Sequence, residues 1–454
     1  MTFTQNRRCS FNYFKEEIQM NNHDPITDVR TLGTGKTIIL GLQHTFAMFG
    51  ATVLVPILTG LPIATTLLMA GLGTLLFHLI TKGQVPAFLG SSFAFLGGYA
   101  AVAPLLKDGS PNVEMLPYAC GGVFCAGLVY LVMSALIKGF GAKKVMRFFP
   151  PVVTGPIIIS IGLILAPSAI NNCATNWFIA LVALVTVIVF NIWGKGMAKI
   201  VPILIGVAVS YIVAIFMGEV DFTGISNEPI LGLPEIMLMK FDLSAIITIM
   251  PIALATMMEH IGDISAIGAT TGKNYIANPG LHRTLLGDGL ATCLASAFGA
   301  PANTTYGENT GVLALTKVYD PKVMRIAAVF AIALACIPKV AFVIECIPAA
   351  TIGGISFILY GMISAIGIRN VVENHVDFTR SRNTIIAALI LVCALGFNSL
   401  GGITFHVLGA SVTLSGLAIA SIVGIIANAV LPGNEYEFKE DVNEENDKFQ
   451  TYKL

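Results

Sequence analysis

Residues 300–309 read APANTTYGEN, a polar stretch that contains Pro and Gly and carries the carboxylate of Glu308. It lies in a chain of 454 residues of which 55% are hydrophobic and 11% charged, whereas a soluble protein has roughly 25% charged residues. This composition predicts an all-α polytopic membrane protein. Irregular backbone at membrane depth needs protein or a water-lined cavity around it, and an acid there marks a functional site by default. The stretch is therefore either a loop outside the membrane or a broken helix that lines a site.

The positions of Lys and Arg predict the number of spans. Of 26 such residues, all except Lys107, Lys240 and Lys339 fall into eight clusters along the chain. Because basic residues are enriched in cytoplasmic loops, we expect all eight clusters on that side. Eight clusters bound seven intervals, and each interval must leave the cytoplasm and return. The sequence thus predicts fourteen spans, both termini in the cytoplasm, and a multi-pass protein of the cytoplasmic membrane.

One interval is too short for two complete helices. Residues 37–81 provide 45 positions, but residues 284–316 provide only 33, and each spanning helix needs about 20. One span of the short interval is therefore incomplete as a helix, and this interval contains residues 300–309. The prediction is a broken helix rather than an external loop.

Two pairs of dipeptides indicate an internal duplication. Pro86-Ala87 and Pro301-Ala302 lie 215 residues apart, and Gln43-His44 and Glu259-His260 lie 216 apart. Seven spans in each unit, an odd number, make the two copies inverted, as in many carriers. We expect short extended segments to interrupt spans 3 and 10, to lie back to back at mid-membrane, and to lead into half-helices. The unpaired N–H groups at the start of a half-helix suit a substrate with carbonyl oxygens or negative charge.

Four ionisable residues of the second half fall within predicted spans: Glu259, His260, Asp263 and Glu308. Glu259 and Asp263 are four residues apart and share one helix face, with His260 beside Glu259. Two carboxylates in a desolvated site do not easily ionise together, so this pair is a candidate holder of a coupled proton, with His260 or a nearby hydroxyl orienting it. The alternative is a structural polar network that holds helices together. Glu308 begins a helix, where it can cap the N-terminus, bind a ligand, or do both.

Other polar residues receive structural interpretations. We expect His44 to hydrogen-bond within its own span, and Asp288, Asn172 and Asn398 to be loop or helix-end residues. Tyr360 either faces the site or lies at the membrane interface. The sequence has no Walker A motif, so an ion gradient rather than ATP is expected to drive transport. Buried carboxylates beside a histidine favour protons as that ion.

Several motifs resemble those of the nucleobase–ascorbate transporter family. They are residues 43–56 (QHTFAMFGATVLVP), 86–95 (PAFLGSSFAF), 259–262 (EHIG) and 303–309 (NTTYGEN). The run from Glu308 to Thr316 fits the family signature, an acid or amide followed by Asn-x-Gly and then a Thr. Glu308 after Thr-Thr-Tyr-Gly resembles the bacterial uracil permease branch. The resemblance extends from about residue 38 to residue 430.

The resemblance implies a division into a core domain, spans 1–4 and 8–11, and a gate domain. The expected boundaries are 1–37 (cytoplasmic N-terminal tail), 38–150 (first core segment), 151–242 (first gate segment), 243–345 (second core segment), 346–431 (second gate segment) and 432–454 (acidic cytoplasmic C-terminal tail). It further implies alternating access, a homodimer and proton symport, with no cofactor beyond the proton.

The resemblance also implies the roles of individual residues. Glu259 and Glu308 would accept the ring N–H groups of a nucleobase, and the backbone amides of Phe93 and Gly307 would donate to two ring carbonyls. The further positions that match residues near the ligand in relatives are Ser91, Tyr306 and Tyr360.

Asp263 departs from the pattern of the uracil permease branch. A uracil permease of the family has His at this position, where it belongs to the proton network, whereas an Asp occurs in purine-handling relatives. Proton coupling in this chain is therefore expected to fall to Glu259, Asp263, Glu308 and His260.

These observations favour proton-coupled uracil uptake across the cytoplasmic membrane. A xanthine or uric acid permease of the same family is the first alternative. An anion exchanger of related fold is the second, although it would place a cation rather than two acids near its site. The sequence presents no nucleophile–base pair and no metal-ligand set, so we do not expect an enzyme. The formal net charge is zero, which argues against nucleic acid as a partner; the expected partners are a small nucleobase and the lipid bilayer.

Overall fold

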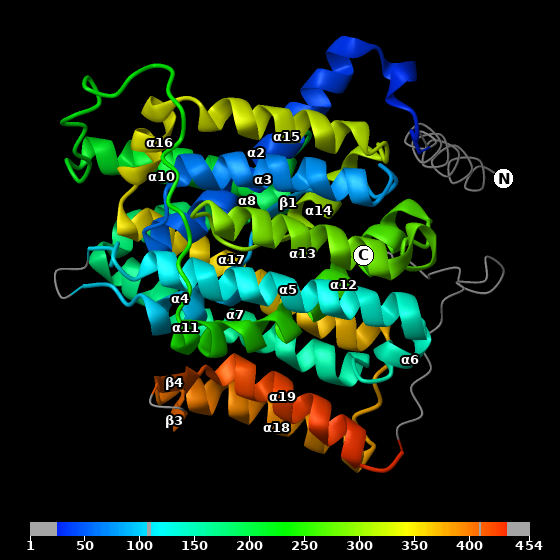
Figure 1. Cartoon of the computed structure of the whole chain (residues 1–454). Helices are drawn as coiled ribbons and strands as arrows, with labels where there is room; N and C mark the ends of the chain where they lie inside the picture. Colours follow the sequence, from blue (N-terminus) through cyan, green and yellow to red (C-terminus); the bar gives the residue numbers. More distant parts are fainter. Residues whose placement is uncertain (1–24, 107–109, 408–409, 434–454) are drawn as a thin grey trace, which may run out of the picture.

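The computed structural model describes residues 25–106, 110–407 and 410–433, and the predicted tails lie mostly outside these ranges (Figure 1). Its longer helices are α2 (Thr34–Thr59), α3 (Ile63–Ile80), α5 (Leu116–Phe140), α7 (Pro151–Thr175), α8 (Trp177–Trp193), α10 (Pro202–Phe216), α12 (Ala253–Thr271), α13 (Leu281–Ala297), α14 (Gly307–Thr316), α15 (Lys322–Ala335), α17 (Ala349–Glu373), α18 (Ser381–Ser399) and α19 (Gly416–Val430). The shorter ones are η1 (Val29–Leu32), η2 (Phe93–Phe95), α4 (Leu96–Val102), α6 (Ala142–Met146), α9 (Met197–Ile200), α11 (Leu243–Ile249), η3 (Met250–Ile252), η4 (Ile276–Gly280) and α16 (Pro338–Glu345). The strands are β1 (Leu89–Ser91), β2 (Asn303–Thr305), β3 (Ile403–Val407) and β4 (Ala410–Leu414).

Gly and Pro set several helix boundaries. Gly60 adopts a left-handed conformation (φ 81°) and ends α2 by donating its N–H to Pro56 O over 2.8 Å. Pro151 and Pro202 are the first residues of α7 and α10, where the absence of a backbone N–H costs no helical hydrogen bond. The local sequence therefore fixes where these helices start and stop.

Apolar helices long enough to cross a membrane make up most of the fold. Within the described residues, seven qualify, counting the continuous run Leu243–Thr271 (α11 to α12) as one. The α15–α16 pair, bent by 84°, can supply an eighth, and four shorter apolar helices accompany them. The prediction of a helical polytopic membrane protein is confirmed, whereas the count of fourteen spans and the inverted repeat stay predictions.

The chain folds around extensive helix–helix contacts. α13 packs against α3 and α5, and α15 packs against α2 and α3. α7 packs along α17, and α18 lies beside α19 at one side of the molecule (Figure 1). The predicted core and gate boundaries stay predictions.

A hairpin between α18 and α19 was not expected in an all-α fold. Strands β3 and β4 pair in antiparallel register, with Ile403 opposite Leu414 and Val407 opposite Ala410. The run from Ile403 to Val407 contains β-branched and aromatic residues, and Gly401 and Gly402 before it have positive φ. These residues favour an extended segment after a turn, which explains the hairpin.

Candidate functional site

The two predicted interruptions meet as a pair of antiparallel strands. Leu89 lies opposite Thr305 and Ser91 opposite Asn303. Two further hydrogen bonds extend the ladder, from Ser92 N to Ala302 O (2.8 Å) and from Tyr306 N to Phe88 O (3.1 Å). All six strand residues are buried. The prediction that both segments are short extended stretches leading into half-helices is confirmed, and they lie side by side as hydrogen-bonded neighbours.

Helix α2 supports this strand pair through hydroxyl groups. Ser91 Oγ donates to Thr52 O over 2.8 Å, and the Tyr306 hydroxyl donates to Ser91 O over 3.0 Å. Gly90 lets the Tyr306 ring approach, because a Cβ on Gly90 would lie 2.5 Å from two ring carbons. The side chains of Ser91 and Tyr306, both predicted near a ligand, therefore fix the strands in this structure.

After each strand, one backbone amide lies at the start of a helix. Phe93 is the first residue of η2 and Gly307 the first of α14, directly after the last ladder bond on each side. Within the described residues, neither amide donates to a loop or side-chain acceptor. Amides at the start of a helix lack intrahelical acceptors and bear a partial positive charge. The two amides are therefore available to acceptor groups of a ligand.

The acids of α12 and α14 lie beside the strand pair. Thr305 Oγ1 donates to Asp263 Oδ2 over 3.0 Å. The other oxygen, Asp263 Oδ1, lies 3.8 Å from the position that a Cβ on Gly307 would occupy. Glu259 interacts electrostatically with both Asp263 and Glu308. The structure thus brings the three acids of the predicted site together at the start of α14.

Asp288 is the functional candidate that the sequence interpretation missed. It lies in the middle of α13, and its side chain and that of His260 are both fully buried. Asp288 Oδ2 is 3.1 Å from His260 Nδ1, and Thr305 Oγ1 is 3.5 Å from the same nitrogen. The prediction of a loop or helix-end residue is wrong, because Asp288 lies in the middle of α13 with its carboxylate against the His260 ring. Its position within the predicted membrane interval was the signal that could have identified it. Asn172 and Asn398 do lie near helix ends.

His44 bonds across two helices rather than within its own. Its ring nitrogen Nδ1 is 3.1 Å from Asn309 Nδ2, and the same amide donates to His44 O over 3.2 Å. Both side chains are buried. The expected intrahelical partner is therefore wrong, and His44 instead anchors the first turn of α14 to α2.

Helix α17 covers the starts of both half-helices. The Tyr360 ring packs edge to face on Phe93, with ring centroids 5.9 Å apart. Ile366 Cδ1 lies 3.7 Å from the position of a Cβ on Gly307. Tyr360 is 1% exposed, so it faces the strand pair and not the membrane interface. The site is closed by protein on this side.

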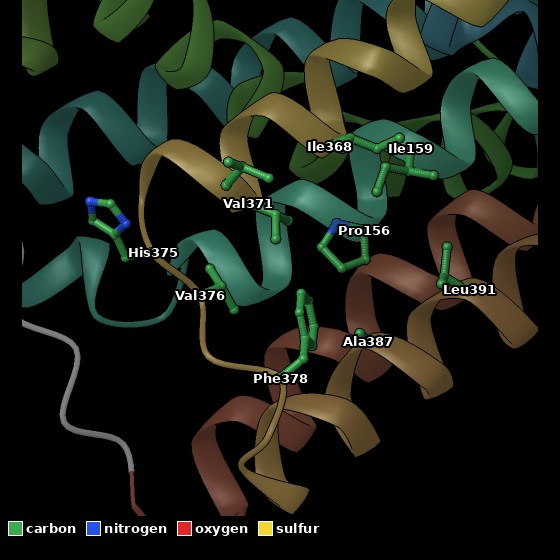
Figure 2. A pocket seen from close by; sticks show the side chains of 10 residues that line it. Pro156, Ile159, Ile368, Val371, His375, Val376, Phe378, Ala387 and Leu391 are labelled. Atoms are coloured by element: carbon green, nitrogen blue, oxygen red, sulfur yellow. The ribbon is translucent and has the colours of Figure 1, made fainter. Parts of the chain in front are cut away.

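A cavity of about 440 Å³ lies away from the strand pair, between α7, α17 and α18. Figure 2 shows Pro156 and Ile159 facing Ile368, Val371 and Leu391 across it. Apart from His375 the residues that line it are apolar, so it offers few groups that would orient a polar solute. The strand pair, with its free amides and acids, remains the candidate site.

Comparisons with known proteins identify the family to which the chain belongs. A family model described as a permease family matches residues 35–400. A uracil permease of Bacillus caldolyticus is 40% identical over 438 residues, which is 93% of this chain and 98% of that protein. A uracil permease of Escherichia coli K12 is 39% identical over 86% of this chain and 90% of that protein. The transmembrane domain of the cyanobacterial bicarbonate transporter BicA shares the fold, with a TM-score of 0.59 and 16% identity over 82% of this chain and 98% of that one. The chain therefore belongs to this permease family, the nucleobase–ascorbate transporter family indicated by its motifs, and is a transporter rather than an enzyme.

Proposed function

We propose that this permease takes up uracil together with protons, by alternating access. The observation that carries the proposal is the β1–β2 ladder, which leaves the amides of Phe93 and Gly307 free beside a group of acids. The names of the similar permeases support uracil as the substrate. The likeness to a bicarbonate transporter concerns the fold alone, and two acids at the site argue against an anion as the substrate.

The proposed contacts match the polar groups of a diketo pyrimidine. Glu259 and Glu308 accept its two ring N–H groups, and the amides of Phe93 and Gly307 donate to its two carbonyls. Glu259 Oε2 is buried and has no hydrogen-bond partner in the described structure, so it can take up a ligand donor. Tyr360 covers the base from α17. A hydrogen bond to a charged group contributes about 1.5–3 kcal/mol, so the acids supply most of the discrimination.

The proposed proton site is the carboxylate pair of α12. Glu259 and Asp263 lie one helical turn apart and interact electrostatically. A proton shared by the pair removes a like-charge repulsion that a desolvated site tolerates poorly. Thr305 orients Asp263 by donating to it, and His260 lies 3.5 Å from the same hydroxyl. Protonation of the pair therefore accompanies binding of the base, and loss of that proton accompanies release of the base.

The proposed transport cycle moves the core domain against the gate domain. In this proposal the chain forms fourteen spans in two inverted repeats, works as a homodimer, and has both termini in the cytoplasm. Two contacts support a common side for the termini. Ile26 pairs with Val318 in a bridge beside the start of α15, and Asn428 near the end of α19 donates to Arg147 O. The described ends lie at the same end of the helix bundle as α6 (Figure 1), where Lys143 and Lys144 are located.

Asp263 supports a second candidate, a xanthine or uric acid permease. An acid here adds an acceptor beside Gly307, which a purine with additional N–H donors could use. The same fold and amides would serve both substrates, so only the accepted base distinguishes them.

Uptake measurements test these proposals. We expect cells that express the protein to accumulate labelled uracil, unlabelled xanthine and sulfate to compete poorly, and a protonophore to abolish accumulation. Strong competition by xanthine would select the purine permease, and competition by sulfate would select the anion exchanger. Accumulation that persists with the protonophore present would contradict proton coupling.

A further inference from the structure

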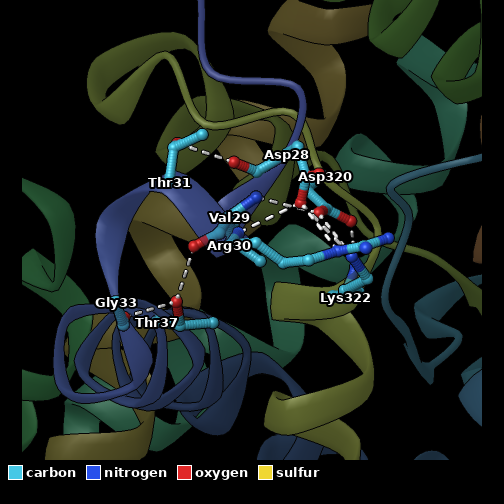
Figure 3. Close-up of polar contacts among 8 residues, drawn as sticks. All are labelled: Asp28, Val29, Arg30, Thr31, Gly33, Thr37, Asp320 and Lys322. Carbon is cyan, nitrogen blue, oxygen red and sulfur yellow. Dashed lines mark hydrogen bonds and ion pairs between the residues drawn. The ribbon is translucent and has the colours of Figure 1, made fainter.

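The segment before α2 is attached to the connection between α14 and α15. We name this attachment the N-terminal clasp: residues 26–29 on one side and residues 317–322 on the other (Figure 3). Ile26 N donates to Lys317 O over 2.9 Å, and Tyr319 N donates to Ile26 O over 2.8 Å. Val29 and Val318 are each 3% exposed. The clasp is therefore a packed, hydrogen-bonded contact between segments of the chain far apart in sequence.

Asp320 is the polar centre of the clasp. The residue is 5% exposed, and its carboxylate accepts from Val29 N over 3.0 Å and from Lys322 N over 2.9 Å. Lys322 Nζ lies 3.4 Å from Asp320 Oδ2 and 3.4 Å from Asp28 Oδ1. The amide of Arg30 and the nearby charges hold the pKa of Asp28 below its ordinary value, so Asp28 stays ionised near neutral pH. Both sides of the clasp are thus linked through charged hydrogen bonds.

Helix α14 packs against α12 and α2, but it is short and most of its residues are not buried. Of its ten residues only Asn309, Val312 and Leu313 are buried, whereas Gly311 and Leu315 are exposed. Helices of this length are marginal unless tertiary contacts hold them. The start of α14 carries the free amide of Gly307 and the acid of Glu308, so its position decides where both groups lie.

The clasp ties α14 to α2 at the end opposite to the His44–Asn309 contact. Thr37 Oγ1, in the first turn of α2, donates to Val29 O over 3.2 Å. At the other end, Asn309 contacts His44 of the same helix over 3.1 Å. The short helix is therefore attached to one long helix at both of its ends.

We propose that Asp320 is a positioning residue for the substrate site: through the N-terminal clasp it fixes α14 along α2, so that Gly307 and Glu308 lie beside the strand pair. This inference rests on the proposed function in assigning these two groups to substrate. Asp320 itself does not touch the substrate. Loss of the clasp lets α14 shift or fray at its far end, and the site at its near end loses its geometry.

The test compares Asp320→Ala with wild type in the purified full-length protein. We expect the dissociation constant for labelled uracil to rise roughly fivefold to tenfold. Direct loss of a charged hydrogen bond to the ligand raises it by about tenfold or more, and the clasp acts on the ligand only indirectly. Hydrogen exchange without ligand should accelerate in residues 307–316 and stay unchanged in residues 89–102. Asp320→Asn keeps an acceptor for the Val29 amide and should recover most of the affinity.

Asp377 supplies the matched control. It also accepts from the amide two residues ahead, Thr379 N at 2.9 Å, and pairs with Arg380, but it lies in the α17–α18 connection. Asp377→Ala should leave both the dissociation constant and exchange in residues 307–316 as in wild type. Unchanged affinity and exchange in Asp320→Ala, even with a lower melting temperature, would overturn the inference, as would equal effects of the two variants. If wild type binds no uracil, the proposed function fails, while the exchange comparison still tests the clasp.

Discussion

The two segments that pair as the strands β1 and β2 have similar backbones and different chemistry. Both run from a three-residue strand into a short helix, and each presents at the turn an amide that donates to no loop or side-chain acceptor among the described residues. In the β1–α4 segment, the residues that begin the helical part, Phe93, Phe95 and Leu96, are apolar and buried. The β2–α14 segment has Glu308 and Asn309 in the first turn of its helix and bonds through Thr305 to Asp263.

This difference separates two tasks within one site. In the proposed site the first segment supplies shape and one amide, and both apolar packing and the Ser91–Thr52 hydrogen bond hold it in place. The second supplies an amide and the acidic environment, and polar contacts to α2 and α12 hold it in place. We therefore expect substitutions on the second segment to abolish coupling or recognition, and substitutions on the first to act mainly through geometry.

Glu308→Gln should have the largest effect. The amide offers a single acceptor oxygen and cannot be protonated, so we expect uptake to be lost while the protein remains in the membrane. A charged hydrogen bond of about 1.5–3 kcal/mol corresponds to a rise in the dissociation constant for uracil of roughly ten- to a hundredfold. Equilibrium binding to purified protein measures this. Near-normal affinity would remove Glu308 from the site and reduce the difference between the segments to packing.

Gly90→Ala should be the most damaging small change on the first segment. The new Cβ would lie 2.5 Å from the Tyr306 ring and 2.7 Å from Thr52 Oγ1, so the strand pair must move. We expect uracil uptake to fall by roughly an order of magnitude, comparable to an overpacked core. Gly97→Ala in α4 is the control, because its Cβ would meet nothing within 4 Å. Equal uptake by the two variants would show that the close approach at Gly90 is unimportant.

Asp263→Asn should change pH dependence more than affinity. The substitution removes a like charge beside Glu259, so we expect the alkaline limb of the uptake profile to shift to lower pH. Accumulation of uracil should weaken severalfold, while exchange of bound uracil should weaken less. The measurement is uptake against pH in cells, with exchange followed in vesicles. An unchanged profile with full accumulation would make Asp263 a packing residue held by Thr305.

Substitutions of Phe93 should have the smallest effect on uracil affinity, and two variants must be compared to separate the role of its amide from that of its ring. Ser92 has ψ 124°, which suits a following proline, and the first position of a helix tolerates one. Phe93→Pro therefore deletes the amide donor with little damage to the backbone. We expect Phe93→Ala to weaken uracil binding by about twofold, because it loses the contact with Tyr360. Phe93→Pro should weaken binding further, and the additional loss should be roughly 0.5–1.5 kcal/mol, the contribution of a neutral hydrogen bond. Equal affinities would exclude the amide as a ligand.

The sequence by itself determined the class of protein and the two places where helices break. Composition and basic clusters indicated a polytopic membrane protein, and the 33 positions of residues 284–316 required an incomplete span. These features are local or additive: chain length limits what can cross a membrane, and Gly, Pro and β-branched residues act on their own backbone. The motif around Glu308 likewise identified the family without any knowledge of contacts.

Only the tertiary structure decided which partners the polar residues have. The sequence predicted Asp288 at a helix end, whereas α13 places it against His260. It predicted a hydrogen bond of His44 within its own helix, whereas α14 brings Asn309 to it. The same holds for Asp320, which contacts Val29 across 291 positions of sequence. A buried polar group without a partner costs free energy, and the partner can come from any segment that the fold brings near. Residue type therefore shows that such a contact is needed, whereas the packing of distant helices determines which residue provides it.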